Sequence, residues 1–198
     1  MARGTLIAFE GIDGSGKSTQ ARRFVAWARA QGREVVHSRE PTDGPWGRKI
    51  REARFQARLS PTDELAAFVE DRKEHVATLI NPALARGALV VVDRYYYSTA
   101  AYQGARGLDP KALVALNRAF APKPDVVVLV DVDPKHSLER IQARGQGVDL
   151  FETLEALTAV RANFLSLVEP HVIVIDGAGD EDTVLTRVLE AIRSKCTL

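Results

Sequence analysis

Gly11-Ile12-Asp13-Gly14-Ser15-Gly16-Lys17-Ser18 is the stretch of this sequence that decides its fold. It matches the pattern Gly-x-x-x-x-Gly-Lys-Ser/Thr, in which glycines let several backbone N–H groups turn toward one anion. An apolar run precedes it and a stretch of helical period follows, so the positive end of a helix adds to the anion site. We expect Lys17 to reach the terminal phosphates of a nucleoside triphosphate and Ser18 to coordinate Mg²⁺. The alternative is a glycine-rich turn with an exposed lysine, which is disfavoured because four fixed positions rarely coincide by chance.

The rest of the chain alternates between apolar, β-branched runs and longer stretches of helical period. The runs expected to be strands are Thr5–Phe9, Glu34–His37, Leu89–Asp93, Val126–Asp131 and Val172–Asp176. The expected helices are Ser18–Gln31, Trp46–Ala57, Pro61–Arg86, Pro110–Phe120, Pro134–Ala143, Leu154–Glu169 and Asp180–Ser194. Parallel strands need crossover connections and are buried on both faces, so this order predicts an α/β fold. The expected architecture is a three-layer P-loop NTPase fold, a five-stranded parallel sheet with helices on both faces, in one domain over residues 1–198.

The charge balance limits the class of partner. The chain has 198 residues, with 27 basic and 26 acidic side chains and a formal net charge of +1. This balance gives no general attraction to nucleic acid or to an anionic membrane, so we expect a small-molecule partner. The apolar stretch Leu6–Phe9 is too short for a signal peptide or a membrane span, which favours a cytoplasmic protein.

Asp93 and Arg94 follow the third expected strand. In such sheets ligands gather at the carboxyl ends of the strands, so this pair is expected beside the glycine-rich loop. An aspartate there can hold metal-bound water, and an arginine can grip a second phosphate as a planar fork. The alternative for the pair is a salt bridge at the strand end. The guanine-reading pattern Asn-Lys-x-Asp is absent from the sequence, which disfavours a GTPase switch.

Four stretches together resemble the thymidylate kinases, along nearly the whole chain. They are Phe9–Thr19, Arg39-Glu40-Pro41, Asp93-Arg94-Tyr95 and Ser98–Gly104. The resemblance implies transfer of the γ-phosphoryl group of ATP to thymidine monophosphate (dTMP) with Mg²⁺, by a homodimer packed through helices. It implies an ATP site at Gly11, Ile12, Asp13, Gly14, Ser15, Gly16, Lys17, Ser18 and Thr19, with Ser18 and Asp93 as metal ligands.

The resemblance also implies roles in binding the acceptor. Asp13 lies beside its sugar and 5′-phosphate, and Arg39 and Arg94 supply the offsetting positive charge. Phe68 and Arg72, four residues apart on one helix face, stack on thymine and hydrogen-bond its 4-carbonyl oxygen. The residue types alone leave Phe68 open as a core residue and Arg72 as a solvated helix charge. The family's remaining acceptor roles fall on Tyr102, which crowds the 2′ position, and on Thr99 and Gln103, candidates for the polar edge of the base.

A lid is expected near residues 140–152. Arg140 and Arg144 are one helical turn apart and precede Gly145 and Gly147, so they could swing onto the transferring phosphate. Family members carry an arginine either inside the phosphate loop or in the lid, and Gly14 at the loop position favours the lid. The expected catalytic residues are therefore Asp13, Lys17, Arg94, Arg140 and Arg144. One departure is Leu150, where many lids have arginine, so surface charges remain the alternative for Arg140 and Arg144.

Two other functions remain open. A deoxynucleoside kinase deprotonates a neutral 5′-hydroxyl and usually resembles Glu-Arg-Ser where this chain has Asp93-Arg94-Tyr95. That difference, together with Arg39, favours a charged monophosphate acceptor. A P-loop module that binds nucleotide without kinase activity is the second alternative, and Leu150 is the feature that keeps it open.

Overall fold

The sheet of this protein is built around the strand that leads into the glycine-rich loop. The computed structural model describes residues 3–55, 59–143 and 153–196. Its strands are β1 (Thr5–Glu10), β2 (Val35–Arg39), β3 (Leu89–Asp93), β4 (Val126–Asp131) and β5 (Val172–Asp176). They form one five-stranded sheet in the order β2-β3-β1-β4-β5, and every neighbouring pair is parallel. The predicted five-stranded parallel sheet is confirmed.

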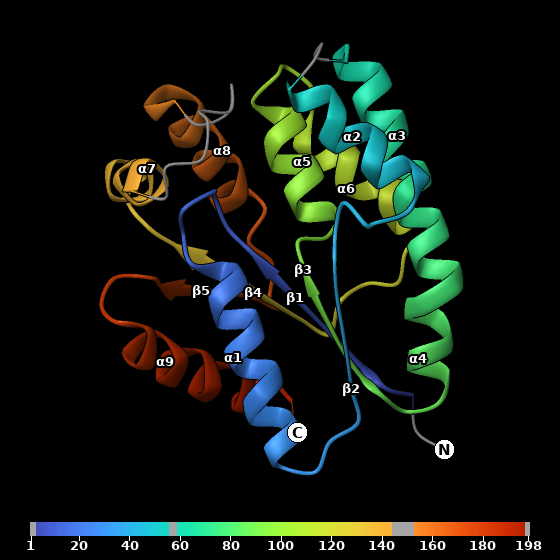
Figure 1. Cartoon of the computed structure of the whole chain (residues 1–198), viewed down its shortest axis with the longest axis vertical. Helices are drawn as coiled ribbons and strands as arrows, with labels where there is room; N and C mark the ends of the chain where they lie inside the picture. The colour runs from blue at the N-terminus through green and yellow to red at the C-terminus, as the bar shows by residue number, and fades with distance from the viewer. Residues whose placement is uncertain (1–2, 56–58, 144–152, 197–198) are drawn as a thin grey trace.

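Helices cover both faces of this sheet, as Figure 1 shows. They are α1 (Lys17–Ala30), α2 (Pro45–Phe55), α3 (Pro61–His75), the π-helical segment η1 (Val76–Ile80), α4 (Asn81–Ala85), α5 (Tyr96–Gly104), α6 (Pro110–Arg118), α7 (Pro134–Ala143), α8 (Leu154–Ser166) and α9 (Glu181–Arg193). Within the described ranges, no helix is both long enough and apolar enough to span a membrane.

Successive residues of β1 point to opposite faces of the sheet and enter different cores. Ile7 and Phe9 pack with side chains of α1 and α9, while Leu6 and Ala8 pack with those of η1, α4, α5, α6 and α8. All four β1 side chains are fully buried. The three-layer arrangement therefore follows from a strand that is apolar on both faces.

Two elements differ from the sequence prediction. Helix α5 was not expected, because its aromatic and β-branched residues have low helix propensity and no side chain caps its first turn from Tyr95. The helix expected over Pro61–Arg86 is interrupted by η1, just before Pro82. Proline lacks an N–H group and its ring clashes with the carbonyl four residues earlier, so a locally wider helix accommodates it.

The register of the strands brings their carboxyl ends together. Asp93 at the end of β3 pairs with Phe9 of β1 on one side and with Arg39 of β2 on the other. The loop that follows β1 therefore starts beside Asp93 and Arg39, although these residues are far apart in the sequence. This edge of the sheet carries the candidate site.

The glycine-rich loop gives a test of its packing. Gly14 has φ +78°, and a Cβ there would lie 2.3 Å from the carbonyl oxygen of Ser137 in α7, whereas Gly16 has φ +89° and no neighbouring atom within 4 Å of such a Cβ. Gly16→Ala should lower the free energy of unfolding by about 1–2 kcal/mol, because only backbone strain is added. Gly14→Ala should lower it more, since α7 must also move. Denaturant unfolding of both variants measures this, and equal losses would contradict the close packing of Gly14.

Candidate active site

Residues 11–18, here called the P-loop, link β1 to α1 and present the amino end of that helix. The cap position of α1 is Gly16, which has no side chain to satisfy the first N–H groups of the helix. The Lys17 ammonium donates to the carbonyl oxygen of Ile12 at 3.4 Å and lies 3.7 Å from Oδ1 of Asp13. Burial and the charge of Arg94 lower the pKa of Lys17 to about 8, against the pull of nearby carboxylates. A bound anion would raise this pKa again and favour the charged form of Lys17.

A cavity of about 440 Å³ opens at the carboxyl ends of the strands, and we call it the basic cavity. It is lined by Asp13, Gly14, Gly16, Lys17, Ser18, Thr19, Arg22, Arg39, Glu40, Pro41, Arg51, Asp93 and Arg94. Five of these side chains are basic and three are acidic, a balance of 5 − 3 = +2. Arginine forks and a helix amino end are the usual partners of phosphate. The cavity is therefore suited to polyphosphate.

Ser18 and Asp93 both line the basic cavity, as the sequence analysis requires of metal ligands. Oδ1 of Asp93 is buried and has no hydrogen-bond partner in the described part of the chain. A buried carboxylate oxygen without a hydrogen-bond partner is suited to a metal ion or to a water molecule bound to that ion. The expected alternative, an ion pair between Asp93 and Arg94, is not what the structure has, because Arg94 pairs with Asp13.

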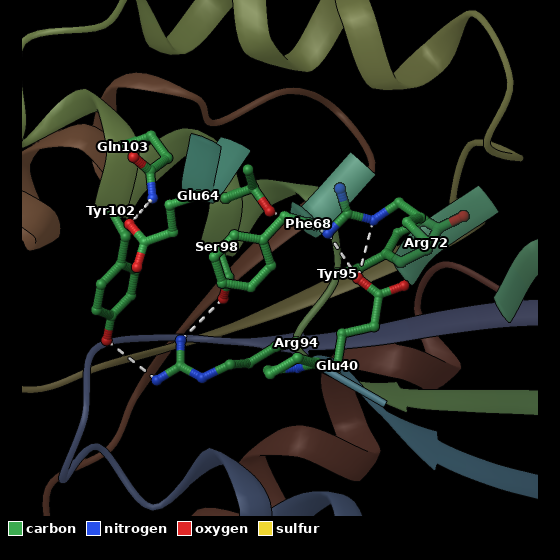
Figure 2. Close-up of a pocket in the computed structure, with 11 residues that line it drawn as sticks. Glu40, Glu64, Phe68, Arg72, Arg94, Tyr95, Ser98, Tyr102 and Gln103 are labelled. Carbon is green, nitrogen blue, oxygen red and sulfur yellow. Dashed lines mark hydrogen bonds and ion pairs between the residues drawn. The ribbon is translucent and has the colours of Figure 1, made fainter. Parts of the chain in front are cut away.

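Arg94 joins the P-loop to α5, and Figure 2 shows its contacts with Ser98 and Tyr102 of that helix. Its Nη2 donates to Oδ1 of Asp13 at 2.5 Å and to the hydroxyl of Tyr102 at 3.0 Å, and the Tyr102 hydroxyl donates to Oδ2 of Asp13 at 2.7 Å. Burial lowers the pKa of Arg94, but Asp13, Tyr102, Asp93 and Glu10 together outweigh it, and the net pKa lies above its ordinary value. Burial also raises the pKa of Tyr102, which keeps its hydroxyl protonated as a donor. Three residues predicted for the acceptor site thus meet in one cluster.

A second, smaller hollow adjoins the basic cavity, and we call it the inner recess (Figure 2). It is lined by Glu40, Pro41, Glu64, Phe68, Arg72, Arg94, Tyr95, Ser98, Thr99, Tyr102 and Gln103. All the predicted acceptor residues except Asp13 and Arg39 lie here, and those two line the basic cavity. The free space is about 30 Å³, enough for no more than about two water molecules. A larger ligand therefore enters only when the walls move apart.

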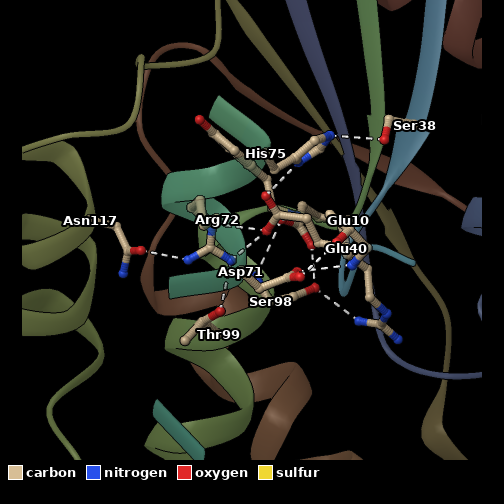
Figure 3. Close-up of polar contacts among 12 residues, drawn as sticks. Glu10, Ser38, Glu40, Asp71, Arg72, His75, Ser98, Thr99 and Asn117 are labelled. Carbon is tan, nitrogen blue, oxygen red and sulfur yellow. Dashed lines mark hydrogen bonds and ion pairs between the residues drawn. The ribbon is translucent and has the colours of Figure 1, made fainter. Parts of the chain in front are cut away.

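Arg72 lies fully buried at the end of the inner recess. Its Nε and Nη2 donate to Oε2 of Glu40 at 2.8 and 2.6 Å, Nη2 also donates to Thr99 at 3.0 Å, and Nη1 donates to Asn117 at 2.5 Å (Figure 3). The alternative of a solvated helix charge is wrong, because Arg72 is only 1% exposed. A guanidinium has five N–H groups, so 5 − 4 = 1 remains without a partner in the described residues.

The loop after β2 is fastened to α3 by residues to which the sequence analysis gave no role. His75 contacts Oε1 of Glu40 through Nδ1 at 3.0 Å and the Ser38 hydroxyl through Nε2 at 2.8 Å (Figure 3). Asp71 accepts hydrogen bonds from the backbone N–H and the hydroxyl of Thr42. These partners are about 30 residues apart or more, so no local pattern could have shown them.

The remaining predicted acceptor residues differ in their exposure. Arg39, with its side chain 62% exposed, pairs with Asp43 at 2.9 Å. Gln103 donates through Nε2 to Glu64 at 2.6 Å, and Glu64 also pairs with Arg106. Arg22 and Arg51 also line the basic cavity, although the sequence did not single them out. Arg22 lies one helical turn after Ser18, so helical spacing could have predicted that it faces the same cavity, whereas no sequence pattern indicates Arg51.

A third cavity, of about 380 Å³, lies on the other side of the P-loop. Arg140 of α7 lines it and donates to the carbonyl oxygens of Gly14 and Gly177, both at 3.4 Å. The first arginine of the expected lid therefore lies beside the P-loop. Arg144 and the remainder of the expected lid, with Leu150, lie in residues 144–152, outside the described residues.

Glu10, the last residue of β1, is a buried carboxyl group that the sequence analysis did not single out. Burial raises its pKa to about 7, although hydrogen bonds from Ser98 and Tyr95 and the charge of Arg94 act in the opposite direction. Its position directly before the P-loop makes it part of the site.

The raised pKa of Glu10 predicts how stability depends on pH. Its folded pKa of about 7 exceeds its ordinary value of 4.5, so its favourable contribution is complete below pH 4.5 and is lost as the pH rises through 7. Glu10→Gln removes this titration. From pH 5 to pH 8 the free energy of unfolding of the parent should fall relative to the variant by up to about 3 kcal/mol. Denaturant unfolding at both pH values measures the difference, and a difference independent of pH would contradict the assignment.

Comparison with known proteins agrees with this geometry. A family profile described as thymidylate kinase matches residues 9–188. The thymidylate kinase of Xanthomonas oryzae pv. oryzae (strain PXO99A) is 50% identical over 182 residues, which cover 92% of this chain and 80% of that protein. The thymidylate kinase of Akkermansia muciniphila is 48% identical over 190 residues, covering 96% and 92%. The predicted resemblance is confirmed, and this chain belongs to the thymidylate kinase family.

Proposed function

We propose that this protein transfers the γ-phosphoryl group of ATP to the 5′-phosphate of dTMP, giving thymidine diphosphate and ADP. One observation carries the proposal: the basic cavity and the inner recess share Arg94, Glu40 and Pro41. A nucleotide lying across that junction would place its phosphate near Lys17 and its base in the inner recess, beside Phe68 and Arg72. The basic cavity thus offers space for an acceptor phosphate beside the P-loop, and the base enters when the recess opens.

ATP binds through the P-loop, with its phosphates held by the backbone N–H groups, Lys17 and Ser18. The third cavity, between Arg140 and the loop at Gly177, accommodates the rest of the donor. No cluster of three or more His, Cys, Asp or Glu side chains in the described ranges could hold a metal by itself. Mg²⁺ would instead be held by Ser18, Asp93 and the phosphates, which is its common mode with nucleotides. Its chemistry is to neutralise charge on the phosphate oxygens.

The acceptor base enters the inner recess when Phe68 moves aside to stack on it. The one unused N–H of Arg72 meets a single carbonyl oxygen, the 4-oxygen of thymine. Thr99 and Gln103 line the remaining polar edge, and Oε1 of Gln103 has no partner among the described residues. Tyr102, held by Asp13 and Arg94, would crowd a 2′-hydroxyl and so favour deoxyribose.

The reaction needs little covalent help from the protein. An oxygen of the acceptor phosphate attacks the γ-phosphorus, the bond to the β–γ bridging oxygen breaks, and ADP leaves with that electron pair. The acceptor phosphate is already ionised near neutral pH, because its second pKa is about 6, so no general base is required. Lys17, Arg94, Arg39 and the lid arginines Arg140 and Arg144 neutralise the charge on the moving group. Asp13 holds Arg94 in place until the acceptor phosphate arrives.

Two further parts of the proposal rest on the family resemblance. The protein acts as a homodimer packed through helices, and it works in the cytoplasm with small nucleotides as its partners. A deoxynucleoside kinase would need a base for a neutral hydroxyl, whereas the basic cavity suits a charged acceptor.

The proposal is tested by incubating the protein with ATP, Mg²⁺ and a panel of nucleosides and nucleoside monophosphates, and then resolving the products. Diphosphate should form from dTMP. Lys17→Ala should lower the rate at least about 100-fold, because a charge beside the transferring phosphate is lost, while the exposed Lys111→Ala should leave the rate unchanged. Product from nucleosides alone would favour a nucleoside kinase. No product from any acceptor would favour a binding module, and a fully active Lys17→Ala would contradict the role of the P-loop.

A further inference from the structure

We propose that Glu10 is a positioning residue for this reaction, which fixes the guanidinium of Arg94 relative to the P-loop through the hydroxyl of Ser98. The inference rests on the proposed phosphoryl transfer and extends it to a residue outside the expected substrate contacts. Glu10 is not a lining residue of the basic cavity, the inner recess or the third cavity. Its effect on catalysis must therefore pass through other side chains.

Glu10 caps a helix from a neighbouring strand. Its Oε1 accepts the backbone N–H groups of Tyr95 at 2.8 Å and of Ser98 at 3.3 Å, at the start of α5. That helix has no side-chain cap of its own and no acidic residue in its first turn. The Ser98 N–H also donates to the carbonyl oxygen of Tyr95 at 3.0 Å, so Glu10 shares this group and is the acceptor for the Tyr95 N–H. A carboxylate at this position also complements the helix dipole. Helix α5, which carries Thr99, Tyr102 and Gln103, is therefore tied to the strand that leads into the P-loop.

The second oxygen of Glu10 starts a relay of hydrogen bonds (Figure 3). The Ser98 hydroxyl donates to Oε2 of Glu10 at 2.5 Å. Because a hydroxyl has one hydrogen, Ser98 then accepts from Nη1 of Arg94, at 2.8 Å. The other end of the Arg94 guanidinium binds Asp13 in the P-loop. The chain of contacts from Glu10 through Ser98, Arg94 and Asp13 thus begins and ends beside the same loop.

This relay is useful because Arg94 is difficult to hold in place. Its backbone has φ +65°, a left-handed conformation that is unfavourable for residues other than glycine. Its side chain has several rotatable bonds, and fixing them costs conformational entropy. A misplacement of about 1 Å at a reacting group can lower a rate about 100-fold. Nη1 donates to Ser98 at 2.8 Å and to the carbonyl oxygen of Gly11 at 3.3 Å, and Nη2 donates to Asp13 and Tyr102. Ser98 is the shorter of the two contacts at Nη1, so it contributes to both the position and the orientation of the fork.

Glu10→Gln separates the two roles of the carboxylate. The amide oxygen can still accept the N–H groups of Tyr95 and Ser98, so the cap on α5 is kept. The amide NH₂ then faces the Ser98 hydroxyl, which loses its acceptor and meets a second donor in competition with Arg94. The variant therefore keeps the fold and breaks the relay.

The test is a double-mutant cycle of Glu10→Gln and Ser98→Ala, with kcat and KM measured for ATP and for dTMP per folded molecule. Each single variant should lower kcat/KM for dTMP about 10- to 100-fold, with KM for ATP changed by less than about threefold. The kcat/KM of the double variant for dTMP should be about that of the less active single variant, because both substitutions break the same relay. Asp125→Asn is the matched control: its carboxylate accepts the N–H of Leu6 at 2.8 Å, near the other end of β1, and its kinetics should be parental.

Several results would overturn the inference. Folded Glu10→Gln with parental kcat/KM for dTMP would contradict it. If the losses of kcat/KM in the two single variants multiply in the double variant, Ser98 acts independently of Glu10. A variant that only loses stability, with parental kinetics per folded molecule, would mean that the carboxylate is merely structural. If Glu10→Gln does not fold, Ser98→Ala decides, because parental kinetics there exclude the relay. An inactive parent protein would remove the proposed function itself, whereas an active parent with unaffected variants removes only this inference.

Discussion

The ion pair between Arg94 and Asp13 is the interaction on which the rest of the site depends. Asp13 belongs to the loop after β1 and Arg94 follows β3, and these strands are neighbours whose ends lie in register. Each charge partly compensates for the loss of water around the other, which is costly for an unpaired charge in a half-buried position. In the proposed reaction, an acceptor phosphate that approaches Arg94 would meet a guanidinium that is already oriented. One contact would thereby join the donor loop to the acceptor site.

In the proposed function, the inner recess also uses a buried charge to orient a ligand. A buried ion pair such as that of Arg72 with Glu40 contributes little net stability, because desolvation offsets the attraction. Its value lies in orientation, since Glu40, Thr99 and Asn117 together occupy four N–H groups of Arg72. The N–H that remains can satisfy one carbonyl oxygen. His75 extends this arrangement to Ser38, so the loop after β2 and the base-binding wall form one connected unit.

Local patterns in the sequence predicted the sheet and the P-loop, whereas the family resemblance predicted that Asp13, Arg94 and Tyr102 share one site. The P-loop was predictable because its chemistry lies within eight consecutive residues, and the sheet because buried parallel strands are apolar throughout. Helix α5 was missed because its cap comes from Glu10, more than 80 residues earlier. The burial of Arg72 was also hidden, since a charge among Glu70, Asp71, Lys73 and Glu74 resembles a solvated helix face until Glu40 and Asn117 are placed beside it.

The central claim is that Arg94, oriented by Asp13, binds the 5′-phosphate of the acceptor. The most direct measurement compares the binding of dTMP and of thymidine to the parent and to Arg94→Ala by calorimetry, with unfolding curves to verify the fold. Loss of a charge-assisted contact should weaken dTMP binding about 10- to 100-fold and leave thymidine binding within about threefold, because thymidine lacks the phosphate. Equal weakening of both ligands, or no weakening of either, would contradict the account.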